Sequence, residues 1–230
     1  MLTCAVSVVV PAHDEQDLLP TCLDALRQAA AQPGVPPVRV LVVADTCSDA
    51  SVDVARTGGA EVLEVALHSA GGSRRAGFDL LLATSSAPPD AHWLATTDAD
   101  SRVPPDWFTM QLALCGQGAD AVAGTVHVDD WSGHGADVAR RFADHYAWEG
   151  HEHPHVHGAN LSLSARAYLA AGGLPPLDLA EDHALVDALV ALGLRVARPT
   201  SSPVVTSART DARCSGGFGD LLASLGAPAA

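Results

Sequence analysis

The sequence of 230 residues contains no lysine and no isoleucine, and its single asparagine is Asn160. All positively charged side chains apart from histidine are therefore arginines, 13 in number, and the formal net charge is -14. A biased genome composition is enough to explain the missing residue types, so we assign them no function. Nucleic acids and anionic membranes are poor partners for this chain, because phosphate surfaces require clustered positive charge. An anionic ligand would have to be held by a metal ion, a few arginines or helix N-termini.

The sequence also lacks the patterns of membrane, disulfide and zinc proteins. No apolar run approaches the roughly 18–20 residues that span a bilayer. The N-terminal MLTCAVSVVVPAHDEQ has no basic region and is typical of a strand, so we predict no signal peptide. The five cysteines are widely spaced without a C-x-x-C pair, which favours reduced thiols. We expect a cytoplasmic protein without a membrane span.

Apolar runs and helical patterns alternate along the first half. Strands are predicted over 5–10, 38–44, 61–65 and 92–97, and the β-branched run at 5–10, ended by Pro11, is typical of a buried parallel strand. Helical patterns lie between them, around 18–26, 48–56 and 74–83, and Asp14 and Glu15 suit the N-terminus of the first helix. The second half is less regular, with a strand expected within 119–128, helices over 137–149, 165–171 and 181–192, and short strands over 195–198 and 204–207. The alternation predicts an α/β fold with a mainly parallel sheet.

Acidic residues follow three of the predicted strands: Asp14 after the first, Asp45 after the second, and Asp98 with Asp100 after the fourth. Ligands bind beyond the carboxyl ends of parallel strands, so these side chains should meet at one edge of the sheet. Two carboxylates one residue apart are suited to a hard divalent cation. Taken alone, Asp98-Ala99-Asp100 is better explained as a turn with solvated acids, and its position after a buried strand is what favours a metal site.

Six segments, taken in order, resemble those of family 2 glycosyltransferases with the GT-A fold. They are VVVPAHDE (8–15), VVADTCSD (42–49), GSRRAG (72–77), TDADS (97–101), GANLS (158–162), and GGL (172–174) followed by Glu181-Asp182. The resemblance implies one GT-A domain over 1–230, with a nucleotide-binding half (1–101) and an acceptor-binding half (102–230). It also implies a UDP- or GDP-sugar donor and a Mn²⁺ or Mg²⁺ cofactor.

The resemblance also implies roles for single residues. Pro11, Ala12 and Asp14 would lie along the nucleotide, Asp45 would bind the base, and Asp98 would touch the ribose directly or through the ion. Asp100 would bind the metal, and Asn160 would shape the donor-sugar pocket with Gly158. Arg75 stands at the family's usual asparagine and would reach the diphosphate, for which arginine is well suited. The chain departs from the family at His13, again in place of asparagine, and at Ala44, where an acid is usual.

Asp182 would be the catalytic base, with Glu181 as the second candidate. Both stand where a helix is predicted to begin, after Pro175-Pro176-Leu177-Asp178. A carboxylate there is also explained by the helix dipole alone. A base must come within hydrogen-bond reach of the acceptor hydroxyl, and a base opposite the leaving group would invert the anomeric carbon.

Three further features have two interpretations each. His151, His153, His155 and His157 would share one face of an extended strand, as a metal site or as a solvated acceptor-side loop. Arg209 and Arg213 would close over the diphosphate or be solvated. Trp131, Tyr146 and Trp148, near Asp129 and Asp130, would stack on an acceptor sugar or pack in the core.

We therefore predict a metal-dependent glycosyltransferase that moves a sugar from a UDP- or GDP-sugar to an unknown acceptor hydroxyl. The arginines expected at the diphosphate are Arg75 and Arg209. The alternatives are a nucleotidyltransferase, whose usual glycine-rich loop is missing after the first strand, and a non-catalytic nucleotide-sugar-binding protein. No dinucleotide G-x-G-x-x-G or P-loop motif is present. We leave open whether the chain forms a homodimer.

Overall fold

The computed structural model describes residues 5–150, 152–177, 179–210 and 218–226. Seven strands form one sheet in the order β3-β2-β1-β4-β8-β6-β9, and three form a second sheet in the order β5-β10-β7. The strands are β1 (Ala5–Ala12), β2 (Val38–Asp45), β3 (Glu61–Val65), β4 (His92–Thr96), β5 (Ser101–Arg102), β6 (Ala121–Ala123), β7 (Val126–His127), β8 (Leu161–Ser164), β9 (Val196–Ala197) and β10 (Val204–Thr206). The helices are α1 (Leu19–Ala30), α2 (Ser51–Thr57), α3 (Ala70–Ala83), α4 (Trp107–Gly116), α5 (Val138–Tyr146), α6 (Ala165–Ala170), α7 (Glu181–Ala191) and α8 (Phe218–Gly226).

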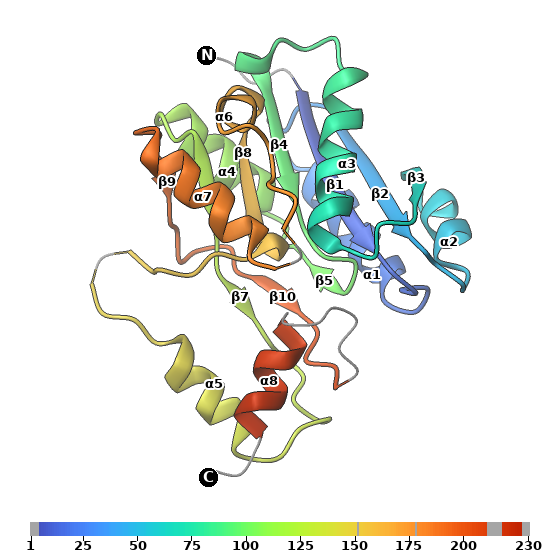
Figure 1. Cartoon of the computed structure of the whole chain (residues 1–230), viewed down its shortest axis with the longest axis vertical. Coiled ribbons are helices and arrows are strands. Elements are labelled where there is room, and N and C mark those ends of the chain that lie inside the picture. The colour runs from blue at the N-terminus through green and yellow to red at the C-terminus, as the bar shows by residue number, and fades with distance from the viewer. Residues whose placement is uncertain (1–4, 151, 178, 211–217, 227–230) are drawn as a thin grey trace.

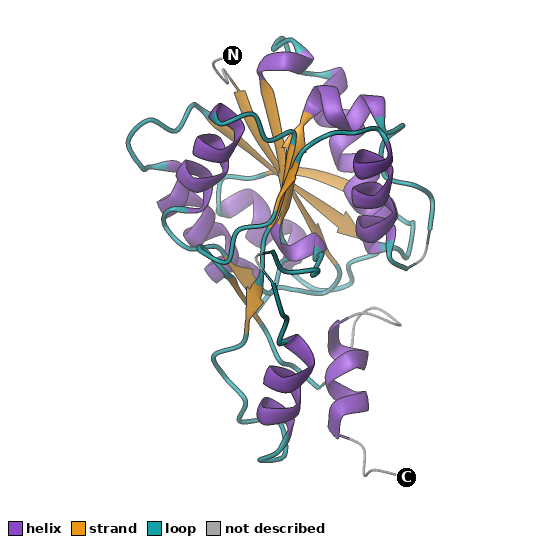
Figure 2. Cartoon of the chain, turned by 90° about the vertical axis from the view of Figure 1, so that its left-hand side faces the viewer, coloured by secondary structure: helices purple, strands orange, loops and turns teal. Residues whose placement is uncertain are grey.

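Strand β1 lies in the middle of the parallel part of the large sheet, between β2 and β4. Its successive valines face opposite sides: Val8 and Val10 belong to one core cluster and Val9 to the other. Helices α1, α2 and α4 cover the first side, and α3, α6 and α7 cover the second (Figure 2). Both faces of β1 are buried, which explains the run of three valines at 8–10. The buried Ser7 of the same strand hydrogen-bonds the His92 ring at 2.8 Å.

The β1-β2-β3-β4 part is parallel, as the alternation predicted, whereas β8 runs antiparallel between β4 and β6. Helix α3 begins at Ala70, four residues before the predicted start, because Ser69 caps it by accepting a hydrogen bond from the Gly72 N–H at 3.1 Å. At Gly77, α3 approaches the sheet closely: a Cβ would lie 2.7 Å from the Val9 side chain.

Helices α5 and α8 pack against each other below β7 and β10 (Figure 1). Their small core contains Val128, Phe142, Ala208 and Leu222. The predicted strand within 119–128 is divided between the two sheets, since β6 belongs to the large sheet and β7 to the small one. Helices α4 and α8 and strands β5 and β8 were not predicted. None of the helices in the described part of the chain is long and apolar enough to cross a membrane.

Candidate active site

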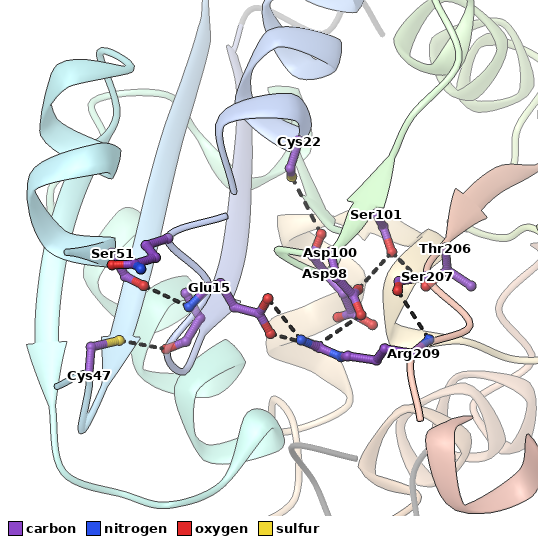
Figure 3. Close-up of polar contacts among 12 residues, drawn as sticks. Glu15, Cys22, Cys47, Ser51, Asp98, Asp100, Ser101, Thr206, Ser207 and Arg209 are labelled. Atoms are coloured by element: carbon purple, nitrogen blue, oxygen red, sulfur yellow. Dashed lines mark hydrogen bonds and ion pairs between the residues drawn. The ribbon is translucent and has the colours of Figure 1, made fainter. Parts of the chain in front are cut away.

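The turn between β4 and β5 presents Asp98 and Asp100 at the carboxyl end of the parallel strands (Figure 3). The Ser101 N–H donates to the Asp98 carbonyl at 3.0 Å and closes the turn. The Asp98 side chain is 34% exposed and the Asp100 side chain 12% exposed, so the pair is set into the protein rather than solvated on a loop. Asp100 also lines a cavity of about 420 Å³, together with Arg102, Asp129, Asp130 and Arg209.

Arg74 forms a buried bridge between two acids that are far apart in the sequence. Its Nη2 donates to Asp98 Oδ1 at 2.6 Å, and its Nη1 donates to Glu181 Oε1. The backbone of Gly158 lies against the guanidinium, and a Cβ there would come within 2.4 Å of Arg74 Cζ. This bridge joins α3, the Asp98 turn and the first residue of α7.

Arg74, not Arg75, is therefore the arginine of α3 that lies among the acids. Arg75 donates to the Leu174 carbonyl at 2.8 Å, pairs with Asp79 at 3.7 Å, and is 42% exposed. Arg74 therefore supplies the positive charge that was expected among these acids from Arg75, whereas the predicted contact of Arg75 with a diphosphate stays a prediction. Neighbouring helix positions point about 100° apart, so a shift of one residue changes which arginine faces the sheet edge.

Arg209 forms a second bridge, from the loop after β10. Its Nη1 and Nη2 donate to the two Glu15 oxygens at 3.0 and 2.5 Å, and Nη2 lies 2.9 Å from Asp100 Oδ2 (Figure 3). Glu15 precedes α1 and is not in its first turn, so the prediction that Asp14 and Glu15 serve the dipole of that helix is wrong. Arg213 lies outside the described residues.

Asp14 and Asp45 use their carboxylates to fix neighbouring loops. Asp14 accepts hydrogen bonds from the N–H groups of Ser48 and Asp49, at 2.6 and 3.2 Å. Asp45 accepts from three successive N–H groups, those of residues 67–69, at 2.7, 3.0 and 2.9 Å, and from the Ser73 hydroxyl at 3.0 Å. Burial raises the pKa of Asp45, but these N–H groups outweigh it and lower the pKa to about 2.

The first-strand residues Pro11 and Ala12 end β1 beside these loops. The Ala12 carbonyl accepts from the Cys47 thiol at 3.4 Å, and His13 Nδ1 donates to the Asp45 carbonyl at 2.7 Å. The ends of β1 and β2 are thus joined side by side. The Asp45 carboxylate already accepts hydrogen bonds from the N–H groups of residues 67–69 and from the Ser73 hydroxyl, so its role in the structure is to hold that loop in place.

The carboxylate oxygens of Asp98 and Asp100 are the type of ligand that a hard divalent cation prefers. Burial raises the pKa of Asp100 to about 6, and the negative charge of Asp98 adds to this, against the lowering by Arg209. A buried carboxylate destabilised by a second one is stabilised by added positive charge, and hard cations prefer such oxygens. Within the described residues, three donors lie close enough for one ion only at Asp14, Cys47 and Asp49. The Asp14 and Asp49 carboxylates there already accept backbone N–H groups.

Asp182 stands in the first turn of α7, next to the Arg74 bridge. Its Oδ2 accepts a hydrogen bond from the Gly158 N–H at 2.8 Å. Asn160 lies two residues further on and is buried: it accepts from Trp107 Nε1 at 2.8 Å and donates to the Thr125 carbonyl at 2.8 Å. The Asn160 side chain thus links Trp107 of α4 to the backbone just before β7.

The histidine stretch forms a stacked ladder in the described part of the chain, while His151 lies outside it. The rings of His153 and His155 are 5.7 Å apart, and those of His155 and His157 are 6.1 Å apart, near parallel in both cases. The rings of His153, His155 and His157 therefore share one face, as predicted for them, although the segment that carries them is not a strand. Tyr146 stacks on His155 at 3.9 Å, and its hydroxyl hydrogen-bonds His157 Nε2 at 3.0 Å.

Trp131, Tyr146 and Trp148 line a second cavity, of about 340 Å³, with Phe142 and His127. Trp131 and Tyr146 also pack against the small core of α5 and α8. The aromatic side chains therefore take part in packing and at the same time present apolar surface to a cavity, so the two interpretations of these residues do not exclude each other.

Burial of His157 makes the stability of the fold dependent on pH. Burial lowers the pKa of His157 to about 4, below the value near 6.5 of an unfolded histidine. As the pH falls from about 6.5 to about 4 the unfolded chain takes up the proton first, so stability is lost in this window. Between pH 7 and pH 5 we expect His157→Gln to lose about 2 kcal/mol less unfolding free energy than the wild type. Urea unfolding at the two pH values measures this difference.

Exposed His127 provides the control, since His127→Gln should follow the wild type at both pH values. The same loss in His157→Gln as in the wild type would contradict the assignment. Loss of stability through Asp45 falls in a different window, from about pH 3.8 to about pH 2, where its lowered pKa makes protonation favour the unfolded chain.

Residues 7–168 match the family described as "Glycosyl transferase family 2", which is more than half of the chain. No curated protein matches the sequence. The family resemblance expected from the six sequence segments is confirmed.

Solved structures share the fold at low sequence identity. TarS 1–349 of S. aureus in complex with UDP-GlcNAc has a TM-score of 0.66 at 14% identity, over 93% of this chain and 61% of that one. Mannosyltransferase PcManGT from Pyrobaculum calidifontis with GDP-Man and Mn²⁺ has a TM-score of 0.66 at 18% identity, over 90% and 58%. Glucosyl-3-phosphoglycerate synthase from Mycobacterium tuberculosis with Mn²⁺, UDP-glucose and phosphoglyceric acid has a TM-score of 0.60 at 20% identity, over 89% and 72%. The likeness shows the GT-A fold predicted from the sequence. The chain therefore spans about 60% of the length of the TarS 1–349 structures.

Proposed function

Because this chain belongs to glycosyl transferase family 2, we propose that it transfers a sugar from a UDP- or GDP-sugar to an acceptor hydroxyl, with a divalent cation at Asp100 and Asp98. One observation carries the proposal. Three carboxylates, Asp98, Asp100 and Asp182, lie with two partly or fully buried arginines at the carboxyl end of a parallel sheet, where α/β proteins bind nucleotides. Solved structures of this fold with UDP-GlcNAc and with GDP-Man and Mn²⁺ support it.

The proposed division of roles follows the geometry of the two bridges. Asp100 and Asp98 would hold Mn²⁺ or Mg²⁺, which supplies positive charge to the leaving diphosphate when it is bound. Arg74 orients Asp98 through its 2.6 Å contact. The N–H contacts of Asp45 and Asp14 hold the loops over which the nucleotide would lie. Family membership favours sugar transfer over nucleotidyl transfer and over binding without catalysis.

Asp182 is proposed as the base that accepts the proton of the acceptor hydroxyl as that oxygen attacks the anomeric carbon. The Gly158 N–H donates to Oδ2 and the His183 N–H donates to Oδ1, both at 2.8 Å, and these two contacts fix the carboxylate close enough to Arg74 for their charges to interact. Attack from the face opposite the diphosphate would give inversion. Glu181 is less suited to this role, because Arg74 already pairs with it and it is only 8% exposed.

Slow hydrolysis of a panel of nucleotide sugars with Mn²⁺ tests the function and the base without knowledge of the acceptor. We expect the wild type to hydrolyse at least one UDP- or GDP-sugar. Asp182→Asn keeps an oxygen for the Gly158 N–H, so it should bind the same donor but lose about 10²–10⁴-fold in rate. Asp187→Asn, on an exposed position of the same helix, should match the wild type.

The two parts of this proposal fail in different ways. No cleavage of any donor by the wild type would contradict the sugar-transfer function. Full activity of Asp182→Asn would leave the function standing and contradict the choice of base.

A further inference from the structure

The Arg209 bridge places a guanidinium on the carboxylate that is proposed to bind the metal. The Arg209 side chain is 20% exposed, and it contacts Glu15 (5% exposed) and Asp100 (12% exposed). Glu15 and Arg209 are 194 residues apart in the sequence. Figure 3 shows Arg209 reaching from the loop after β10 across to Glu15, with Asp98 and Asp100 beside it.

In this arrangement Arg209 supplies positive charge where a cation would. Its Nη2 lies 2.9 Å from Asp100 Oδ2, and the partly exposed Asp98 carboxylate repels the charge of Asp100. A divalent ion bound at Asp100 would stand within a few ångströms of this guanidinium, and at such distances like charges repel strongly in a partly buried site. Arg209 and the ion therefore compete for Asp100.

An Arg209 that loses Asp100 to a cation keeps its two hydrogen bonds to Glu15 but loses the second of its two carboxylate partners. A further anion nearby would restore the lost charge pairing, because a charge away from water is stabilised by opposite charges around it. Arginine binds phosphate oxygens in the same bidentate manner as carboxylates. The loop that carries Arg209 lines the cavity beside Asp100, so a diphosphate held by an ion at Asp100 would lie within its reach.

We propose that Arg209 is an exchangeable counter-charge: it pairs with Asp100 and Glu15 when no donor is present, and moves to the donor's diphosphate when a divalent cation binds Asp100. The inference rests on the proposed function and adds a coupling to it. The cation alone binds weakly because it must displace Arg209, whereas cation and diphosphate together bind well because Arg209 gains a new partner. The coupling is reciprocal, as thermodynamic linkage requires.

Calorimetric titration with Mn²⁺ alone, and then with UDP and with GDP at saturating Mn²⁺, tests the exchange on the full chain. Arg209→Gln should bind Mn²⁺ alone about tenfold more tightly than the wild type and the nucleotide about tenfold more weakly. Arg209→Lys keeps the competing charge and should stay near the wild type with Mn²⁺ alone. Arg27→Gln removes the same charge from an exposed pair with Asp24, and should leave both constants within about twofold, which controls for net charge.

The opposite directions of the two changes distinguish exchange from a merely structural bridge. If Arg209→Gln weakens both bindings, or leaves Mn²⁺ binding unchanged, the inference is overturned. The Mn²⁺ titration is repeated with Glu15→Gln and with the double variant Glu15→Gln, Arg209→Gln, in which loss of Arg209 leaves no uncompensated charge at Glu15. The double variant should still bind Mn²⁺ more tightly than Glu15→Gln alone. A wild type that binds neither UDP nor GDP with Mn²⁺ contradicts the proposed function itself, whereas a wild type that binds one of them, with no gain in Arg209→Gln, overturns the exchange alone.

Discussion

Replacing Asp100 with asparagine should remove the metal-dependent part of nucleotide binding and lower sugar transfer by about 10³-fold or more, since a bound metal contributes several kcal/mol to charge stabilisation. Asparagine keeps the shape of the side chain but removes the negative charge that a cation needs. Arg209 retains its two contacts with Glu15, so the fold should persist. Titration with UDP or GDP, with and without Mn²⁺, measures the first effect, and donor hydrolysis measures the second.

Asp129→Asn is the matched control for nucleotide binding. Asp129 lines the same cavity, but its partner is Arg102 and its side chain is 52% exposed. The variant should keep the response of nucleotide binding to Mn²⁺. An Asp100→Asn enzyme that still binds nucleotide more tightly when Mn²⁺ is added would place the cation elsewhere and contradict the proposed donor set.

Replacing Arg74 with glutamine should lower the free energy of unfolding by about 3–5 kcal/mol, because it leaves the buried Glu181 carboxylate without its partner. Arg75→Gln is the matched control, one position along the same helix. Arg75 is 42% exposed and its ion pair with Asp79 is long, at 3.7 Å, so this variant should lose less than about 1 kcal/mol. Urea unfolding at neutral pH compares the two.

A double variant separates the ion pair from general damage to α3. Arg74→Gln with Glu181→Gln leaves no uncompensated charge at Glu181, so it should be more stable than Arg74→Gln alone. Equal losses in Arg74→Gln and Arg75→Gln would show that the bridge contributes nothing particular to the fold.

Local sequence patterns predicted the parallel core of this protein well. Both faces of β1 are buried, so its run of valines is enough to identify a central strand from the sequence. The carboxylates that follow β1, β2 and β4 do gather at one edge of the sheet, as the position of strand ends requires. The antiparallel β8 is apolar only in part, at Leu161 and Leu163, and its pairing with β4 depends on contacts distant in the sequence.

The partners of the site charges were less predictable, for physical reasons. Arg74 and Arg75 are adjacent, and only the rotation of α3 decides which of them faces Asp98 and Glu181. Glu15 looked like a helix-terminal acid, yet it pairs with a residue 194 positions away. Side-chain ion pairs depend on loop geometry that no local pattern contains, which is why the acids of the site were found and their arginines were partly misassigned.

In the proposed function, the acids at the sheet edge hold a nucleoside diphosphate through a divalent cation. Thermal unfolding with UDP, GDP or NAD, each with and without Mn²⁺, measures whether they do. A ligand at about 100 times its Kd adds about 2.7 kcal/mol to the stability of the folded state. We predict that UDP or GDP with Mn²⁺ raises the Tm by roughly 5–10 °C, that either without Mn²⁺ raises it much less, and that NAD has no effect. If no nucleoside diphosphate raises the Tm in the presence of Mn²⁺, the claim is contradicted.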